Sequence, residues 1–302
     1  YPPTATISSI SPQIAELDSS VSFSGSGSDP DGTISEYKWT SSIDGSLSTS
    51  ASFSTTDMTF GNHTITFRVK DNDGVWSDNV TSWVDVRKSP EWSYEIEDNV
   101  ESMAISADGE YIIAGSNNGN IYLFDKDSNT LIWSYDTTGW LSVAISADGE
   151  YIAVGSYNDK VYLFDKDSST PLWSYEVDDD VKAVAISADG DYIVTGSRDG
   201  KVYLFGKDSS TPLWSYTDSD YITSVDISAD GEYIVAGSED NKVYLFNKNS
   251  STPLWTYTTG GDVNKVAISA DGEHITAGTS STKVYLFDKD SSTPLWSFNS
   301  GE

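Results

Sequence analysis

One segment of this chain recurs in near-identical copies, and the spacing of the copies restricts the fold more than any other feature. A clear copy spans residues 161–173 and reads Val-Tyr-Leu-Phe-Asp-Lys-Asp-Ser-Ser-Thr-Pro-Leu-Trp. The closing tryptophan returns at separations of 41, 40, 41, 41 and 41 residues, as Trp92, Trp133, Trp173, Trp214, Trp255 and Trp296. A period this regular predicts an array of equal structural units.

Each repeat contains four short runs with the composition of β-strands. In the third repeat they cover residues 181–187, 191–196, 201–205 and 212–216. A Ser-Ala-Asp-Gly tight turn joins the first two runs. The second and third runs are apolar at nearly every position, as expected when both faces of a sheet are covered. Four strands in about 41 residues are typical of a propeller blade, so we predict a β-propeller of four-stranded blades with five repeats.

The repeats resemble two known families of propeller blades. Residues 227–238, Ile-Ser-Ala-Asp-Gly-Glu-Tyr-Ile-Val-Ala-Gly-Ser, resemble WD-repeat blades. Lys242-Val-Tyr-Leu-Phe and the closing Leu254-Trp255 resemble quinoprotein (PQQ-like) repeats. The resemblance covers residues 91–299 and implies the propeller fold. A phenylalanine stands where the Trp-Asp pair of WD repeats would begin, and the ligands of catalytic quinoproteins are missing, so quinone catalysis is not expected.

Residues 1–88 show short alternating runs separated by turn residues, which predicts a small antiparallel β-sandwich before the propeller at 89–302. Residues 26–32, Ser-Gly-Ser-Asp-Pro-Asp-Gly, together with 34–39 and 61–74 resemble a PKD (polycystic kidney disease) domain. The resemblance spans about residues 4–87. It implies a small immunoglobulin-like β-sandwich that serves as a spacer or adhesion module of secreted and cell-surface proteins, often archaeal or bacterial, without catalytic activity.

The number of fourth strands does not match the number of the other strands. Five sets of the first three strands are present, but the fourth strand has six copies, because residues 91–94 (Glu-Trp-Ser-Tyr) precede the first set. One possibility is a five-bladed ring with one spare strand. The other is a larger propeller whose further blades were removed or come from another chain. An unpaired strand would invite association between chains.

Charge and composition exclude several classes of function. The 302 residues carry 47 Asp and Glu against 17 Lys and Arg, a net charge of −30. Such a surface repels nucleic-acid phosphates and anionic lipid, so neither is an expected partner. The absence of cysteine excludes thiolate chemistry and Cys-ligated metals. No apolar run approaches ~18 residues, so no membrane insertion is expected.

The opening Tyr-Pro-Pro lacks an initiator methionine and a signal peptide, so we interpret the sequence as a mature segment of a longer protein. With the family resemblance, this predicts an extracellular or cell-surface location.

Comparison of the repeats with one another points to a binding surface. Two loops vary between repeats: the entry loop, which leads into the first strand, and the middle loop, between the second and third strands. In an up-and-down blade both emerge on one face, where aromatic and charged residues would bind a glycan or a protein. The candidates are Trp140, Tyr157, Arg198, Tyr221, Glu239 and Asp262. The alternative is that solvated loops simply vary freely.

Two groups of aspartates are candidate metal ligands. Asp29, Asp31, Asp71 and Asp73 lie in two Gly-containing turns and could bind calcium, although aspartate is also common in tight turns. Residues 178–180 (Asp-Asp-Asp) could bind a divalent cation at the rim of the propeller, or form a solvated loop. No cofactor is required by the sequence, and calcium is the one that we consider possible.

No motif marks a catalytic centre, so we predict that the chain is not an enzyme. The only histidines are His63 and His274, and Asp226 is a single acid in a first strand that otherwise carries alanine. The first hypothesis is an extracellular binding or adhesion protein with a PKD-like spacer. The second is a surface-layer or filament subunit joined through the unpaired strand. The third is a carbohydrate-active propeller enzyme, which would need two opposed carboxylates.

Overall fold

The computed structural model describes residues 1–299 and 301, and they divide into two compact units, Tyr1–Glu91 and Trp92–Glu302. All regular structure in these residues is β-strand, which confirms the predicted all-β class. In this part of the chain there is no helix long and apolar enough to cross a membrane. The two units are described separately below.

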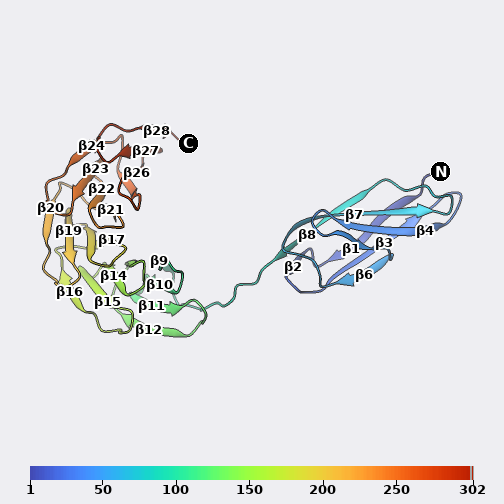
Figure 1. Ribbon diagram of the computed structural model, residues 1–302, viewed down its shortest axis with the longest axis horizontal. Helices are drawn as coiled ribbons and strands as arrows, with labels where there is room; N and C mark the ends of the chain where they lie inside the picture. Colours follow the sequence, from blue (N-terminus) through green and yellow to red (C-terminus); the bar gives the residue numbers. More distant parts are fainter. Residues whose placement is uncertain (300, 302) are drawn as a thin grey trace. The chain divides into compact units, whose positions relative to one another are not determined.

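The first unit is a sandwich of two sheets (Figure 1). One sheet has the order β1 (Thr4–Ser11), β3 (Val21–Ser28), β6 (Ser52–Thr55). The other has the order β2 (Ile14–Glu16), β8 (Val80–Arg87), β7 (Gly61–Asp71), β4 (Ile34–Ser41), β5 (Gly45–Ser48). We expected only antiparallel pairs, but β2 runs parallel to β8, because the first segment leaves one sheet after β1 and continues along the edge of the other.

Trp39 forms the centre of the sandwich core. Its side chain is fully buried, with its ring centroid 4.2 Å from that of Phe67 and 5.6 Å from that of Phe23. The indole N–H donates to the Ser50 carbonyl at 3.0 Å, so the polar atom of this large side chain keeps a partner after burial. A Cβ atom on Gly25 would lie 2.6 Å from the Phe67 ring, so only glycine leaves room for this packing.

The second unit consists of five four-stranded antiparallel sheets, which we number as blades 1 to 5 (Figure 1). The strands of blades 1 and 2 are β9 (Val100–Ile105), β10 (Tyr111–Ser116), β11 (Asn120–Asp125), β12 (Leu131–Asp136), β13 (Leu141–Ile145), β14 (Tyr151–Ser156), β15 (Lys160–Asp165) and β16 (Trp173–Glu176). Those of blades 3 to 5 are β17 (Val181–Ile186), β18 (Tyr192–Ser197), β19 (Lys201–Gly206), β20 (Trp214–Thr217), β21 (Ile222–Ile227), β22 (Tyr233–Ser238), β23 (Lys242–Asn247), β24 (Trp255–Thr258), β25 (Val263–Ile268), β26 (His274–Thr279), β27 (Lys283–Asp288) and β28 (Trp296–Asn299).

The second and third strands of the inner blades are buried on both faces, as their composition predicts. In blade 3, Ile193 and Val194 of β18 and Leu204 and Phe205 of β19 are all fully buried. We call the side of a blade that contacts the next blade its leading face, and the side that contacts the preceding blade its trailing face. The apolar core therefore lies between blades, in four junctions.

At each junction, the closing tryptophan of one repeat contacts the next blade. Trp255 of blade 4 donates its indole N–H to the Lys289 carbonyl of blade 5 at 2.8 Å, and its ring lies 5.3 Å from Phe287. The same pair of contacts recurs for Trp133, Trp173 and Trp214, with hydrogen bonds of 2.7–2.8 Å and ring distances of 5.4 Å. The tryptophan period in the sequence therefore marks the contact between neighbouring blades.

Two further contacts repeat at the junctions. Alanine amides after the first strands donate to the alanine carbonyls of the next blade at 2.9–3.0 Å, in the series Ala107, Ala147, Ala188, Ala229 and Ala270. Glycine in the second strand accepts a side chain of the next blade. A Cβ atom on Gly237, for example, would lie 2.5 Å from Val263. These contacts leave little freedom in how one blade meets the next.

The five blades form an open arc and not a closed ring (Figure 1). Neighbouring first strands pack together from β9 to β25, but β25 and β9 make no comparable contact within the described residues. Residues 91–94 are not a strand, contrary to our expectation. Trp92 nevertheless donates to the Lys126 carbonyl at 2.5 Å and lies 5.5 Å from Phe124, so it takes the place of a closing tryptophan on the trailing face of blade 1.

Candidate functional site

The two variable loops of the repeats lie on one face of the propeller, which we call the loop face. Backbone hydrogen bonds join each entry loop to the middle loop of the same blade, as from Tyr157 N–H to the Trp140 carbonyl at 3.0 Å. The Glu239 N–H bonds to the Tyr221 carbonyl in the same way. The two loops that differ most between repeats therefore form a single surface.

Four of the six candidate residues on the loop face form one continuous stack, which we call the aromatic ladder. The rings of Trp140 and Tyr157 are stacked, with centroids 5.6 Å apart and an interplanar angle of 25°. The Arg198 guanidinium lies 5.1 Å from the centre of the Tyr157 ring and 5.9 Å from that of Tyr221. Trp140 is 50% exposed and Tyr221 41%, so both ends of the ladder are accessible to a partner.

Local geometry holds the ladder in place. Gly139 adopts a φ of +82°, and a Cβ atom there would lie 3.0 Å from Tyr157, so this glycine allows the two loops to approach. Arg198 is fixed by an ion pair of 2.6 Å between its Nη1 atom and Asp180. The guanidinium is thus oriented before any partner arrives.

A polar pocket of about 230 Å³ lies beside the ladder. It is lined by Glu101, Ser102, Trp140, Leu141, Ser142, Tyr157, Lys182 and Lys265. The Lys182 ammonium donates to the Tyr157 hydroxyl at 2.8 Å and lies 5.3 Å from the centre of its ring. Lys182 and Lys265 are not among the residues that we predicted from the sequence. The signal was present, since each places a charge in a first strand that is mostly small and apolar.

The other two candidates, Glu239 and Asp262, lie on the loop face but are not members of the stack. Glu239 is held beside the ladder through the backbone link to Tyr221, and Asp262 accepts the Ser280 N–H at 2.8 Å through its backbone carbonyl. Neither side chain lines the polar pocket. Both residues belong to the same surface, but the side-chain contacts described above are those of the aromatic ladder.

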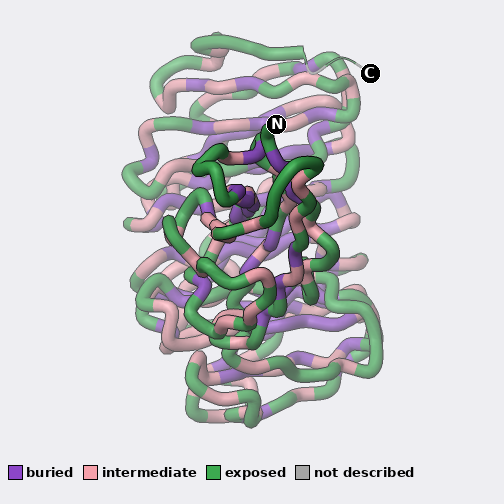
Figure 2. Tube along the Cα trace, turned by 90° about the vertical axis from the view of Figure 1, so that its right-hand side faces the viewer, coloured by how far each residue is buried: buried purple, intermediate pink, exposed green. Residues whose placement is uncertain are grey.

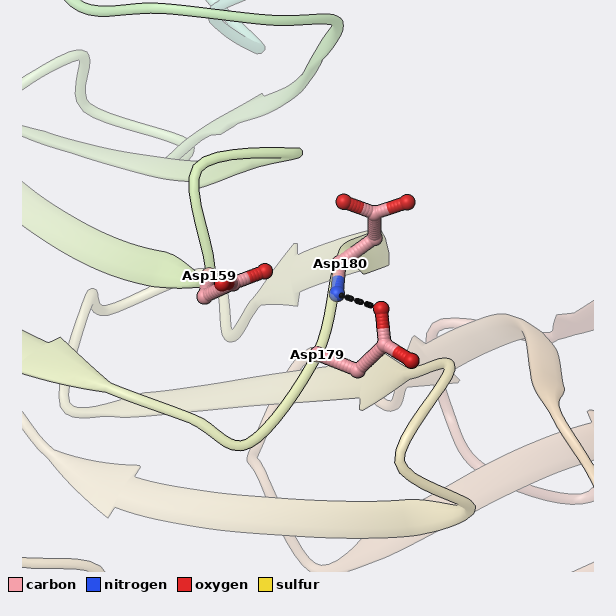
Figure 3. Close-up of side chains that lie close together, drawn as sticks. All are labelled: Asp159, Asp179 and Asp180. Atoms are coloured by element: carbon pink, nitrogen blue, oxygen red, sulfur yellow. Dashed lines mark hydrogen bonds between the residues drawn. The ribbon is translucent and has the colours of Figure 1, made fainter.

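A carboxylate cluster lies at the junction of blades 2 and 3. Figure 3 shows Asp179 and Asp180 on one loop and Asp159 on the neighbouring loop. One carboxylate oxygen from each lies within 4.8 Å of the others. Burial raises the pKa of Asp159, and the charges of Asp180 and Asp179 add to that rise. The three groups therefore repel one another, and the Asp180–Arg198 ion pair offsets part of that repulsion.

This cluster differs from the one that the sequence indicated. Of the run 178–180, Asp178 turns away and forms an ion pair of 2.5 Å with Lys201. Asp159 of the middle loop in blade 2 takes its place. Cation binding at this rim stays a prediction.

The calcium candidates lie in two loops of the sandwich that touch each other. Asn72 accepts a hydrogen bond from the Thr33 N–H at 2.8 Å, which links the loop of Asp29 and Asp31 to that of Asp71 and Asp73. The Asp71 carboxylate is already engaged, since it accepts the N–H groups of Asp73 and Val75 at 2.9 and 2.8 Å. Calcium binding by these four aspartates also stays a prediction.

Asp226 makes a structural contact between blades. Its carboxylate accepts the Ile227 N–H and, across the junction of blades 4 and 5, the Ile268 N–H, both at 2.9 Å. Burial raises the pKa of this carboxyl, while the two backbone hydrogen bonds and Lys265 act in the opposite direction. The acid that breaks the alanine pattern thus ties two blades together.

The two histidines do not form a pair. His63 is buried in the sandwich, with its Nδ1 atom 2.7 Å from the Ser41 hydroxyl and its Nε2 atom 2.7 Å from the Thr59 carbonyl. His274 is exposed in β26 of the propeller. They belong to different units of the chain.

Comparison with known proteins identifies both units. Residues 73–216 and 181–302 match the family model described as outer membrane protein assembly factor BamB, and residues 10–84 match the K319L-like PKD domain. Both resemblances given above, to PKD domains and to PQQ-like repeats, are thereby confirmed. A search of curated proteins finds no match to the chain.

Proposed function

The chain belongs to the family described as outer membrane protein assembly factor BamB, and from this premise we propose that it is a non-catalytic binding protein whose loop face holds a protein partner. The propeller and the PKD-like domain together indicate a surface or assembly-type protein, and the propeller indicates protein interaction.

The aromatic ladder is the observation that carries this proposal. Aromatic and arginine side chains are enriched where binding energy concentrates, and here Trp140, Tyr157, Arg198 and Tyr221 stand in contact with one another. Since Arg198 is already fixed by Asp180, little side-chain entropy remains to be lost on binding. A glycan could stack on the same rings, and the experiment below separates the two classes of partner.

Charge favours an acidic group on the partner. The chain has few cations, yet Lys182 and Lys265 both line the pocket beside Trp140. A carboxylate placed there would meet two ammonium groups and one carboxylate, that of Glu101, at the edge of an exposed indole, so the two lysines outweigh the single acid. We propose that the partner presents such a group to the pocket.

The PKD-like unit would act as a spacer at the cell surface. The two domain types indicate an extracellular or envelope-associated protein. A small sandwich with a packed core around Trp39 can hold a binding module away from the surface without contacting the partner. On this proposal the sandwich sets the distance from the cell surface, and the propeller binds the partner.

We propose no catalytic step. PQQ-like repeats belong to a propeller family that is usually non-catalytic in assembly factors. Asp226 is engaged with two backbone amides, and Asp180 of the carboxylate cluster is held in an ion pair with Arg198.

The test is site-specific photo-crosslinking to surface proteins of the cells that make this chain. A photoreactive residue at position 140 should capture one defined protein. The same residue at Leu254, which is equally exposed on the connection between β23 and β24, should not capture it. With the captured protein purified, Trp140→Ala should weaken binding roughly 30-fold, as expected for a residue that dominates an interface.

Leu254→Ala is the matched control, because it removes a similarly exposed apolar side chain away from the loop face. Equal weakening by both substitutions would contradict a specific role of the ladder. Binding of a purified oligosaccharide that is lost in Trp140→Ala, with no protein captured, would replace the protein partner by a glycan.

A further inference from the structure

One face of the sandwich carries unpaired positive charge, although the chain has a net charge of −30. In β7, the side chains of Ile65, Phe67 and Val69 are fully buried in the core, shown as the buried segments in Figure 2. Successive side chains of a strand point to opposite faces, so those of Thr66 and Arg68 point away from the core. β7 lies between β8 and β4 in the five-stranded sheet. We call the face on which Thr66 and Arg68 lie the outer sheet face.

Four side chains form a square on the outer sheet face. The strand register pairs Lys38 of β4 with Arg68 of β7, and Thr40 with Thr66. Residues two apart in a strand share a face, so the two pairs lie side by side. Lys38 and Arg68 therefore place like charges directly opposite each other, an arrangement that destabilises a sheet. Stability of the sheet alone does not account for this pair.

The square borders a pocket of about 210 Å³ in which every lining side chain is a hydrogen-bond donor. The lining residues are Lys38, Thr40, Thr66, Arg68 and Asn79. An ammonium, a guanidinium, two hydroxyls and a carboxamide can all donate, and no carboxylate stands among them. Within the part of the chain that the structure describes, none of the five side chains forms a hydrogen bond or an ion pair. Converging free donors with two cations are suited to an oxyanion.

Trp76 orients the guanidinium of the square. The Arg68 Cζ atom lies 4.4 Å from the centre of the Trp76 ring, and an isolated β-bridge joins Trp76 to Lys70. This stacking holds Arg68 before a ligand arrives, so less side-chain entropy is lost on binding. Lys70 itself is paired with Glu36 at 3.6 Å, so it does not add to the free charge of the square.

An exposed indole lies beside the square. Thr66 of β7 pairs with Thr81 of β8, and the next outward pair along the two strands is Thr64 with Trp83. Trp83 is 44% exposed, so its ring presents a flat apolar surface one step away from the hydroxyl donors. The C–H face of a sugar ring can stack on such a surface while its hydroxyls meet the polar side chains.

A sugar fits the outer sheet face better than a peptide does. An extended peptide adds to the edge of a sheet through main-chain hydrogen bonds. The square lies over β7 and β4, and β7 is an inner strand that is paired on both sides, so only side chains face a ligand here. The net charge of −30 repels a dense polyanion, which favours a ligand with a single acidic group at this position.

We propose that the outer sheet face binds an acidic glycan, with the carboxylate of a uronate residue between Lys38 and Arg68 and a neighbouring sugar ring on Trp83. The guanidinium fork of Arg68 holds the two carboxylate oxygens, and the threonine hydroxyls donate to the sugar. The bound carboxylate also offsets the repulsion between the two cations. This site lies in the sandwich and is separate from the loop face, so it does not rest on the protein partner proposed above.

Calorimetric titration of the whole chain with xylotriose that carries one glucuronate tests the proposal. The wild type should bind this oligosaccharide, and neutral xylotriose should bind roughly tenfold more weakly or not at all. Lys38→Gln and Arg68→Gln should each weaken binding of the acidic oligosaccharide roughly tenfold, as expected for the loss of a charge-assisted hydrogen bond. Lys88→Gln is the matched control, because it removes the same charge from an exposed residue after the end of β8 and should leave the affinity unchanged.

Thermal unfolding without ligand separates binding from a structural role. Lys38→Gln removes the repulsion with Arg68, so this variant should unfold at the same temperature as the wild type or at a higher one, although it binds more weakly. A lower unfolding temperature would show that Lys38 serves the stability of the sheet, and that result would overturn its assignment to a ligand.

Three further results would contradict the proposal. One is a wild type that does not bind the acidic oligosaccharide, and another is equal affinity for neutral xylotriose. The third is displacement of the oligosaccharide by an equal concentration of acetate, which would reduce the pocket to a site for small anions. Trp83→Ala should weaken binding several-fold with an unchanged unfolding temperature, and unchanged binding would overturn the placement of a sugar ring on this indole.

Discussion

Val243 and Val284 stand in identical sequence surroundings, Lys-Val-Tyr-Leu-Phe, yet one is fully buried and the other is 39% exposed. The first lies on a covered blade face and the second on an open one. The difference therefore comes entirely from the neighbouring blade. In a repeat fold of this kind, burial belongs to the junction between two repeats and not to the repeat itself.

The largest difference in stability between substitutions on a covered face and on an open face is expected at the closing tryptophans. Trp255→Ala removes the ring that covers Phe287 and the hydrogen bond to the Lys289 carbonyl, so it should destabilise the propeller by about 3 kcal/mol. Trp296→Ala removes an exposed ring and should cost less than about 0.5 kcal/mol in the monomer. Urea unfolding in dilute solution measures both, and equal losses would refute the contrast between covered and open faces.

A smaller contrast is expected at two glycines of the second strand. Gly237→Ala places a Cβ atom 2.5 Å from Val263 and should cost about 2 kcal/mol through overpacking. Gly278→Ala meets nothing within 4 Å and should be neutral or slightly stabilising. The thermal midpoints of the two variants, measured side by side, test this, and a large loss for Gly278→Ala would mean that the open face is covered in solution.

Substitution of the aspartate in the Asp-Gly turn should have the smallest effect on stability. This effect should be equal in blade 1 and blade 4, so it serves as the control. Hydrogen bonds from the Ser106 hydroxyl and the Glu110 N–H lower the pKa of Asp108 in blade 1. The Ser228 hydroxyl and the Glu232 N–H lower the pKa of Asp230 in blade 4. These hydrogen bonds lie within single blades, so Asp108→Asn and Asp230→Asn should cost similar, modest amounts of stability at neutral pH.

The contribution of these two aspartates to the free energy of unfolding should decrease as the pH falls. Because the folded pKa lies below the unfolded value of about 3.9, the contribution of each aspartate is complete above that pH. It is lost as pH falls through the folded pKa, so variants and wild type should converge in acid. Unfolding midpoints measured from pH 7 down to about 3 follow this convergence. A larger effect in blade 4 than in blade 1 would mean that these turns also depend on neighbouring blades.

Local periodicity was enough to predict the blades. The tryptophan period and the Asp-Gly turns give the number of repeats, because the four strands of each blade pair with one another within about 41 residues. The same reasoning placed Trp140 and Tyr157 on one face, since strand order alone decides where the loops emerge. Their stacking on each other needed the three-dimensional structure.

Features that depend on the meeting of distant blades could not be predicted. Lys182 and Lys265 line one pocket although two repeats separate them, because the arc curves around a common centre. Asp159 joins Asp179 through the junction of blades 2 and 3. Trp92 has the sequence context of a closing strand, but among the described residues no third strand pairs with it, so its indole packs on blade 1 outside any strand.

The open arc also has a dynamic consequence. With nearest-neighbour coupling, a blade inside the arc must break two junctions to unfold, whereas blades 1 and 5 need to break only one each. Opening should then begin at both ends and move inward, as a frayed helix does, and amide hydrogens in β18 should exchange far more slowly than those in β10 or β26. A closed ring has no ends from which to fray, so among these five blades the gap between blades 5 and 1 sets the order of unfolding.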